Sequence, residues 1–180
     1  RDHRVHHKYS ETTADPHNAQ RGFFYAHVGW LLCKKHPDVV IEGKKLDFND
    51  LKRDGFVSFQ RKLDPWFTMF MCFLMPGLVA SYGWGENMWN AVWVAGFLRY
   101  IFVLHSTWLV NSAAHLWGER PYDPDSNPAE NPWVAILAFG EGWHNWHHKY
   151  PFDYAASEYG ILQQFNPTKL VIDLAALCGA

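Results

Sequence analysis

Cysteine and net positive charge are both scarce in this sequence. The three cysteines, Cys33, Cys72 and Cys178, are widely spaced and form no CxxC pair, which argues against a disulfide framework and against a thiolate zinc site. Lys and Arg together number 16 against 18 Asp and Glu, so the chain has no bulk attraction to a polyanion and we expect no nucleic-acid partner. No initiator methionine precedes Arg1, and we therefore expect a chain that starts inside a longer protein.

Charged residues are also nearly absent from the middle of the chain. Positions 1–62 hold 12 of the 16 basic residues, whereas positions 65–98 contain a single charge, Glu86. The 19 residues Trp66–Trp84 carry no charge, and a helix of about 20 residues can cross a hydrocarbon core of about 30 Å. We expect a transmembrane helix here, kinked near Pro76.

A second apolar stretch runs from position 88 to about 114 and is interrupted only by Arg99 and His105. A short turn at 83–87 separates it from the first, so the two stretches predict a transmembrane helical hairpin. Tryptophans near the ends of both stretches suit the membrane interface, where an amphipathic ring is favoured. The alternative is a buried helix pair in a soluble protein.

The distribution of Lys and Arg predicts the orientation of this hairpin. Eight basic residues lie between positions 34 and 62, and such an excess marks the cytoplasmic side. Because a hairpin crosses twice, both flanking segments then face the cytosol. We expect an all-α protein with a cytosolic segment 1–64, the hairpin 65–117 and a second cytosolic segment 118–180. Short helices are expected at 50–63, at 133–140 and from about 168, with a proline-rich connector at 118–132.

Six of the 11 histidines belong to two copies of one motif. The pattern HxxHHKY occurs at positions 3–9 and again at 144–150. On a helix, positions i+3 and i+4 both neighbour position i, so each copy presents three imidazoles on one face. Imidazole binds Zn, Cu, Fe and Ni, and six exceed the needs of one tetrahedral zinc. The pattern predicts two metal ions; the alternatives are a solvated helix face or pH-sensitive histidines.

Another candidate ligand lies near the cytosolic end of the second apolar stretch. Asn111 and His115 are one helical turn apart there, and polar groups in a membrane helix are costly and mark functional sites. We expect His115 to be a ligand, because it lies at the depth where the two motifs would meet; the alternative is that it snorkels to the interface. Hydrogen bonding in place of metal binding is expected for His105, His17, His27 and His36.

Several longer segments resemble the animal stearoyl-CoA (acyl-CoA) desaturases, a family of membrane di-iron enzymes. The resemblance extends over essentially the whole chain, and the loop near residues 84–89 is most similar to the insect branch. The segments that carry it are residues 1–12 (RDHRVHHKYSET), 15–18 (DPHN), 22–37, 111–115 (NSAAH) and 140–148 (GEGWHNWHH).

This resemblance implies four transmembrane helices, of which the hairpin is the second half, beneath a cytosolic helical cap that encloses two irons. It implies nine histidine ligands, with Asn111 holding an iron-bound water. The family's first box, HxxxxH, and the two helices before it have no match here. We therefore expect the N-terminal third to be missing and these 180 residues alone to be inactive. The seven ligands present are His3, His6, His7, His115, His144, His147 and His148.

The implied activity is the introduction of a cis double bond into a saturated acyl-CoA. Dioxygen is the oxidant, and the electrons come from cytochrome b5 and its NADH-dependent reductase. The implied location is the endoplasmic reticulum membrane, with the histidines facing the cytosol. Two alternatives stay open, a membrane di-iron hydroxylase that inserts oxygen and a membrane metal-binding or transport protein.

The resemblance also implies contacts with the substrate. Thr107 and Trp108 are expected to line the bend of the acyl tunnel. The coenzyme A headgroup, whose phosphates attract cations, is expected to contact Arg1, Asp2, Lys34 and Lys35. The two lysines equally fit an ordinary positive-inside flank.

Overall fold

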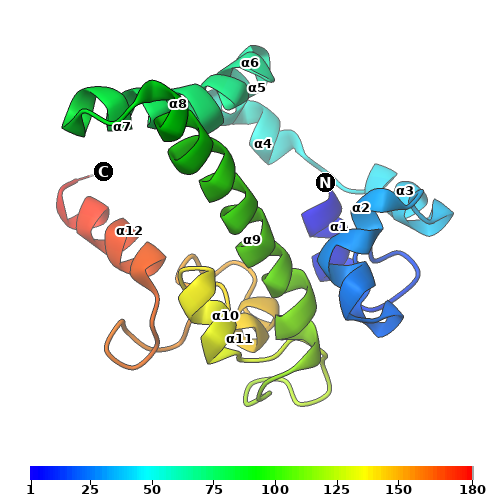
Figure 1. The fold of residues 1–180 in the computed structure, drawn as a ribbon. Coiled ribbons are helices and arrows are strands. Elements are labelled where there is room, and N and C mark those ends of the chain that lie inside the picture. The colour runs from blue at the N-terminus through cyan, green and yellow to red at the C-terminus, as the bar shows by residue number, and fades with distance from the viewer. Residues whose placement is uncertain (180) are drawn as a thin grey trace. The chain divides into compact units, whose positions relative to one another are not determined.

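The computed structural model describes residues 1–179, which form helices joined by turns and loops, with no β-strand among them (Figure 1). The predicted all-α fold class is confirmed. The chain divides into two compact units, one built from Arg1–Leu46 and the residues from His105 onward, the other from Asp47–Leu104. The division into a cytosolic segment 1–64, a transmembrane hairpin 65–117 and a cytosolic segment 118–180 depends on the position of a bilayer, and it stays a prediction.

The first unit is held together around the C-terminal end of one long helix. Val110, Ala113 and Ala114 of that helix pack against Val134 to form a buried apolar cluster. Backbone bridges join Glu130 to both Glu119 and Trp143, and they fasten the proline-rich connector. The helices of this unit are α1 (Asp2–Tyr9), η1 (Ala19–Arg21), η2 (Tyr25–Gly29), α2 (Trp30–Leu32), α3 (Pro37–Lys44), the end of α9 (Arg99–Leu116), α10 (Pro132–Leu137), α11 (His144–Lys149) and α12 (Pro167–Leu177).

Two of these helices differ slightly from the predicted bounds. Helix α10 ends at Leu137 and not at 140, because Phe139 (φ 53°) and Gly140 (φ 112°) adopt left-handed backbone conformations that end a helix. Helix α12 begins at Pro167, where the Asn166 side chain accepts a hydrogen bond from Lys169 N at 2.9 Å and caps the first turn.

The second unit contains the predicted hairpin and the segment that precedes it. Its helices are α4 (Asn49–Arg53), α5 (Gly55–Leu63), α6 (Trp66–Met69), η3 (Phe70–Leu74), α7 (Met75–Trp84), α8 (Met88–Ala91), η4 (Val92–Leu98) and residues 99–104 of α9. The helix predicted at 50–63 is two helices, because the Asp54 side chain accepts a hydrogen bond from Val57 N at 2.9 Å and caps α5.

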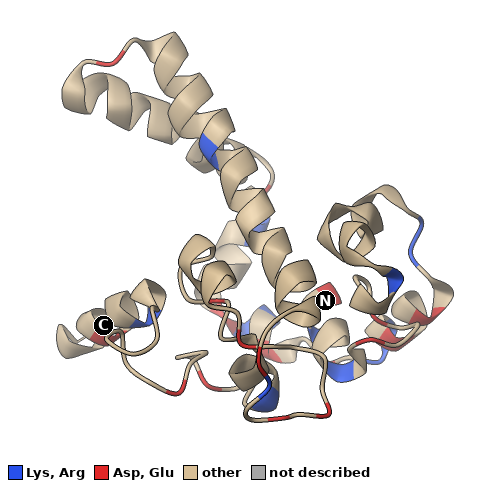
Figure 2. Ribbon diagram, turned by 60° about the horizontal axis from the view of Figure 1, so that its bottom comes forward, with Lys and Arg blue, Asp and Glu red and all other residues tan. Residues whose placement is uncertain are grey.

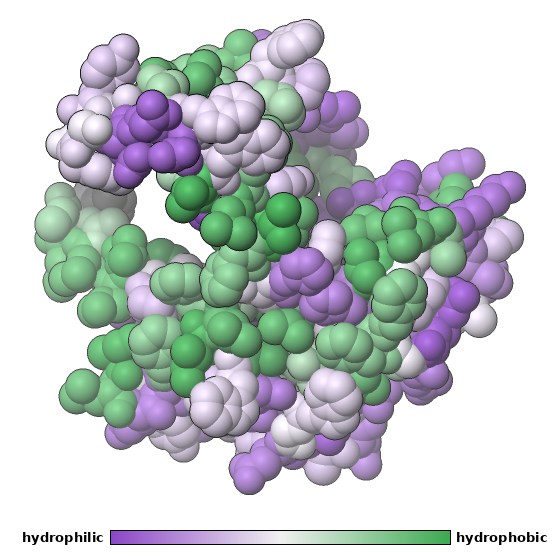
Figure 3. Space-filling view, viewed as in Figure 1, coloured by the Kyte–Doolittle hydropathy of each residue, from purple (hydrophilic) through white to green (hydrophobic). Residues whose placement is uncertain are grey.

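Two helical segments of the described chain are long and apolar enough to cross a membrane. They are Trp66–Trp84, with 19 residues, and Met88–Leu116, with 29. Only 11% of the apolar window in each is buried, whereas a core helix in a soluble protein buries its apolar side chains. Figure 2 shows both segments almost without charged residues, and Figure 3 shows apolar side chains exposed along α9. These features favour the membrane hairpin over the buried pair.

The helix is π-helical just before Pro76, the position at which the sequence predicts a kink. η3 ends two residues before Pro76, and proline has no N–H to donate to the carbonyl four residues earlier, which is that of Cys72. The Arg99 guanidinium donates to Cys72 O at 2.6 Å, and its Nε donates to Ala95 O at 2.8 Å. Arg99, the one Lys or Arg in the two apolar stretches, therefore donates a hydrogen bond to the Cys72 carbonyl, which Pro76 cannot do.

This bond predicts an energetic coupling between Arg99 and Pro76. Arg99→Met is expected to destabilise the hairpin by about 1 kcal/mol, the range of hydrogen bonds between membrane helices. In a Pro76→Ala background the cost is expected to fall towards zero, because residue 76 regains an N–H for the Cys72 carbonyl. The measurement is a double-mutant cycle of unfolding in bicelles. Equal costs of Arg99→Met in the two backgrounds would contradict it.

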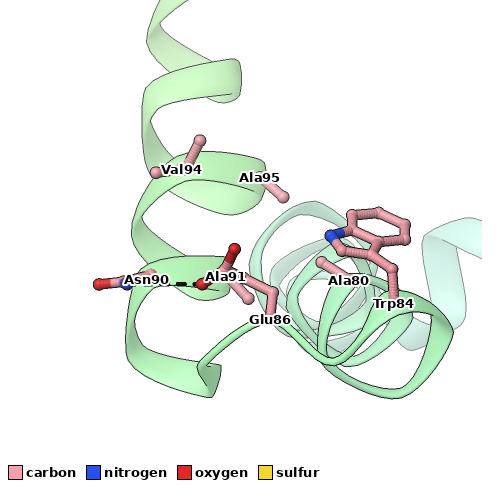
Figure 4. A pocket seen from close by; sticks show the side chains of 7 residues that line it. All are labelled: Ala80, Trp84, Glu86, Asn90, Ala91, Val94 and Ala95. Atoms are coloured by element: carbon pink, nitrogen blue, oxygen red, sulfur yellow. Dashed lines mark hydrogen bonds between the residues drawn. The ribbon is translucent and has the colours of Figure 1, made fainter.

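A pocket of about 280 Å³ lies beside the turn of the hairpin, between α7 and the α8–η4 segment (Figure 4). Small side chains leave this space, and its polar edge is formed by Glu86, whose Oε1 accepts from Asn90 Nδ2 at 3.4 Å. Its lining is Ala80, Trp84, Glu86, Asn90, Ala91, Val94 and Ala95. None of these is a histidine, and Asp47–Leu104 as a whole contains none, so the histidines predicted as metal ligands all lie in the other unit.

Candidate metal centre

The seven predicted ligands all lie in the first unit and come from three helices. Helices α1 and α11 each carry three histidines at positions i, i+3 and i+4, which places each trio on one helix face. The seventh, His115, is buried one residue before the end of α9. The structure brings these side chains together as two groups, which we call the four-His cluster (His6, His115, His144 and His148) and the three-His cluster (His3, His7 and His147).

The four-His cluster is a convergence of ring nitrogens in a buried space. One nitrogen from each ring lies within 4.8 Å of all the others. His144 Nε2 lies 3.0 Å from His115 Nε2 and 3.1 Å from His148 Nε2, and His6 Nε2 lies 3.3 Å from His148 Nε2. His6 and His115 are each 2% exposed and His144 is 4% exposed, whereas His148 is half-buried and lines an open pocket together with His7. Three of the four rings are therefore shielded from solvent.

The three-His cluster lies next to the first and is more open. His7 Nε2 lies 3.1 Å from His147 Nε2, and the ring of His3 lies 4.5 Å from that of His7. His3 is exposed and the other two are half-buried. The rings of His7 and His148 stack at 4.3 Å, which places the two clusters side by side.

The spacing of the nitrogens fits a shared cation in the four-His cluster. Ligands at about 2.1 Å from one ion lie roughly 3.0 Å apart at octahedral angles and roughly 3.4 Å apart at tetrahedral angles. The Nε2 separations of 3.0, 3.1 and 3.3 Å fall within that range. All donors are imidazoles, which suit Zn, Cu, Fe and Ni. The two clusters are therefore compatible with two bound metal ions.

Burial keeps the imidazoles in the form that can bind a metal. Desolvation, reinforced by repulsion from neighbouring imidazoles, lowers the pKa of His7 to about 3 and that of His147 to about 4. The same causes lower the pKa of His144 and of His148 well below the usual histidine range. A lowered pKa means that these rings are neutral at pH 7, so each keeps one nitrogen lone pair available to a cation.

Asn145, inside the second HxxHHKY motif, fixes α11 to the proline-rich connector. Its side chain is fully buried, and Oδ1 accepts from the backbone N–H groups of Tyr122 and Asp123 at 2.9 and 3.0 Å. Its Nδ2 donates to Pro128 O at 2.9 Å. Glu130 adds a second anchor, because its Oε1 accepts from Trp146 N at 2.8 Å. Burial raises the pKa of Glu130 to about 7.

Two further residues at the site escaped the sequence-based prediction. Glu11 and Asp15 place carboxylates within 2.9 Å of ring nitrogens of the four-His cluster. Both follow the first HxxHHKY motif, in the segment that carries the family resemblance. Their position within that segment was the one indication that they belong to the site. The spacing of these residues along the sequence does not show that the loop turns back and brings them to the histidines.

The family model described as fatty acid desaturase matches residues 1–164. The chain belongs to the fatty acid desaturase family. It is 57% identical over 179 residues to an acyl-CoA desaturase of Cyprinus carpio, an alignment that covers 99% of this chain and 54% of that relative. With its apolar helices and histidine clusters, this desaturase-family chain is a membrane protein with candidate metal-binding sites.

Two relatives from Acheta domesticus are similar to nearly the same degree. The chain is 55% identical to an acyl-CoA Delta-9 desaturase and 54% identical to an acyl-CoA Delta12-desaturase, over 99% of this chain and 50% of each relative. This chain thus spans about half the length of the curated relatives it matches. Identity to the fish and cricket proteins is so similar that it does not single out the insect branch.

The remaining histidines of this desaturase-family chain lie outside the two clusters. His105 Nδ1 lies 3.0 Å from His27 Nε2, and His27 Nδ1 lies 3.0 Å from Ser112 Oγ, so both are hydrogen-bonded as expected. His36 accepts from Asp38 N at 3.3 Å. His17 differs, because its Nδ1 is buried with no hydrogen-bond partner among residues 1–179.

The side chains predicted to contact substrate lie at two places in the first unit. At the start of α1, Asp2 pairs with Arg1 at 3.4 Å and with Lys35, while Lys34 is exposed. On α9, Thr107 is exposed and half-buried Trp108 packs its ring 5.1 Å from that of His105. Asn111, also on α9, is half-buried one turn before His115.

Proposed function

We propose that the protein containing this chain is a fatty acyl-CoA desaturase that forms a cis double bond in a saturated acyl chain. The observation that carries the proposal is the convergence of seven histidines from three helices into two adjacent clusters. The names of the relatives, all acyl-CoA desaturases, agree with it. An oxidation of unactivated methylenes needs a redox-active metal, and clusters of neutral imidazoles can hold iron.

Two irons are the proposed cofactor, one for each cluster. Bound there, they would supply the activation of dioxygen, which with two electrons and two protons removes two hydrogens from adjacent methylenes and is reduced to two molecules of water. The protein's own contribution is to hold the neutral rings in register and to shield the buried rings of His6, His115 and His144 from bulk water. Asn111, one turn before His115, is proposed to orient a water molecule at the site.

We propose two substrate-binding sites, one formed by charged residues near the start of α1 and one formed by residues of α9. Arg1, Lys34 and Lys35 are cations that suit the phosphates of coenzyme A, and Asp2 holds Lys35 through its ion pair. Thr107 and Trp108 are proposed to line the acyl tunnel.

The proposed electron source is cytochrome b5 with its NADH-dependent reductase, and dioxygen is the co-substrate. The proposed location is the endoplasmic reticulum membrane, with the histidines on the cytosolic side. The basic residues before Trp66–Trp84 support that orientation, because Lys and Arg are enriched on the cytoplasmic side of membrane proteins.

Product analysis tests the proposed function. Microsomes that contain the protein carrying this chain are supplied with NADH, cytochrome b5, its reductase and stearoyl-CoA, and the acyl products are identified by mass spectrometry. We expect a monounsaturated product that depends on both NADH and the expressed protein. A hydroxylated acyl product would favour the hydroxylase instead. Bound metal without any acyl product would favour a metal-binding or transport protein.

A further inference from the structure

Two buried carboxylates lie directly behind the four-His cluster. Glu11 Oε1 lies 2.7 Å from His115 Nδ1, and Asp15 Oδ1 lies 2.9 Å from His6 Nδ1. The side chains of the first pair are 7% and 1% exposed, and those of the second are 0% and 3% exposed. Each carboxylate therefore meets a ring nitrogen at a position where both side chains are largely buried.

The opposite nitrogens of the same two rings point into the four-His cluster. His115 Nε2 lies 3.0 Å from His144 Nε2, and His6 Nε2 lies 3.3 Å from His148 Nε2. A neutral imidazole has one N–H, and an ionised carboxylate can only accept a hydrogen bond. The carboxylates therefore place the N–H on Nδ1 and leave the Nε2 lone pair facing the cluster.

The two carboxylates are themselves held in place by the loop after α1. Glu11 Oε2 accepts from Ala19 N at 2.8 Å, and Asp15 Oδ2 accepts from Glu11 N at 2.8 Å. Asp15 Oδ1 also accepts from His17 N at 3.1 Å. These bonds fix the orientation of each carboxylate without a bound cation. Through the carboxylates, the loop therefore also orients the rings of His115 and His6.

The three-His cluster lacks this arrangement within the described residues. No carboxylate among residues 1–179 lies within ion-pair distance of His3, His7 or His147. A buried Nδ1 without a hydrogen-bond partner in the described chain occurs in both clusters, at His147 and at His144. The two clusters therefore differ in what surrounds their rings as well as in the number of histidines.

We propose that Glu11 and Asp15 are positioning residues that fix His115 and His6 in the Nδ1–H tautomer and so raise the metal affinity of the four-His cluster selectively. This inference rests on the proposed function, because it assumes that the protein binds a metal ion in each cluster. Partners of this kind raise metal affinity about 10- to 100-fold in other metal sites.

The test uses Glu11→Gln and Asp15→Asn in the protein that contains this chain. Gln at position 11 keeps the shape of the side chain and one oxygen for the N–H groups of Ala19 and Gln20. Asn at position 15 keeps the shape but loses one loop hydrogen bond, because Oδ1 accepts from His17 N and Oδ2 accepts from Glu11 N. The NH2 group of each amide, however, disfavours an N–H on the facing Nδ1, so the ring moves its proton to Nε2 and loses the lone pair that faces the cluster. We expect one of the two irons to be released to a ferrous chelator about 10- to 100-fold faster, with the second iron unaffected.

The matched control is Glu42→Gln, in the same unit. Glu42 accepts from Tyr9 Oη at 2.5 Å and Lys45 Nζ at 2.6 Å and contacts no histidine. This control should release both irons at the wild-type rate. The thermal unfolding of metal-free Glu11→Gln, which keeps its loop hydrogen bonds, should match that of metal-free Glu42→Gln, because a positioning role acts through the metal.

Three outcomes separate this inference from the proposed function. Wild-type release of both irons in Glu11→Gln and Asp15→Asn would overturn the inference alone. Equal loss of both irons together with a destabilised metal-free protein would also overturn it, since that result shows a purely structural role. A wild-type protein that binds no iron would overturn both the inference and the proposed function.

Discussion

Replacing His144 by alanine in the protein that contains this chain is expected to abolish double-bond formation and to lower the metal content from two ions to about one. His144 is 4% exposed, and its Nε2 lies 3.0 Å from His115 Nε2 and 3.1 Å from His148 Nε2. The ring of His144 therefore lies between His115 of α9 and His148 of α11. Alanine removes its nitrogen and leaves a buried gap with no other donor to fill it.

The matching change in the other cluster is His147→Ala. Its Nε2 lies 3.1 Å from His7 Nε2, so we expect the loss of the second ion and the retention of the first. The control is His36→Ala, because His36 is exposed and only caps α3. Metal analysis of the purified proteins measures the stoichiometry. Two ions in either cluster variant, together with normal product formation, would contradict our assignment of the ligands.

The sequence predicted which histidines share a helix face because helical spacing is a local property. Histidines at i, i+3 and i+4 share a face wherever the helix lies, so both HxxHHKY copies could be interpreted without knowing the tertiary structure. The uncharged run Trp66–Trp84 also required only a length and a composition. The sequence could not assign histidines to a particular cluster, because the pairing of His6 with His115 depends on how α1 meets α9.

The supporting residues escaped prediction because loops and packing place them. Glu11 has a left-handed backbone conformation, with φ at 61°. In this turn its side chain reaches the ring of His115, which lies 104 positions later in the sequence. No periodicity marks such a contact. Asn145 lies between two ligands in the sequence, yet its amide is directed to the connector. The helix predicted at 50–63 is divided at Asp54 by a single capping hydrogen bond, which its hydrophobic pattern does not show.

The second large effect is expected for Gly142→Ala, at the approach to α11. A Cβ on Gly142 would lie 2.1 Å from Ala135 N and 2.4 Å from Asn131 O. Both are backbone atoms of the first turn of α10 and its cap, so they cannot rotate away as a side chain could. Asn131 N also donates to Gly142 O at 2.8 Å, and that bond must break if the segments separate. Overpacking of this kind costs about 3 kcal/mol.

This displacement should reach the metal ions, because α11 begins two residues later and carries ligands of both clusters. We expect Gly142→Ala to unfold at a clearly lower temperature and to lose metal from both clusters, unlike His144→Ala, which loses one ion. Gly160→Ala is the control, since nothing lies within 4 Å of a Cβ at that position. Thermal unfolding in detergent and metal analysis measure the two effects. A Gly142→Ala protein that keeps both ions and the wild-type unfolding temperature would show that α10 and α11 do not lie as close together as this backbone contact requires.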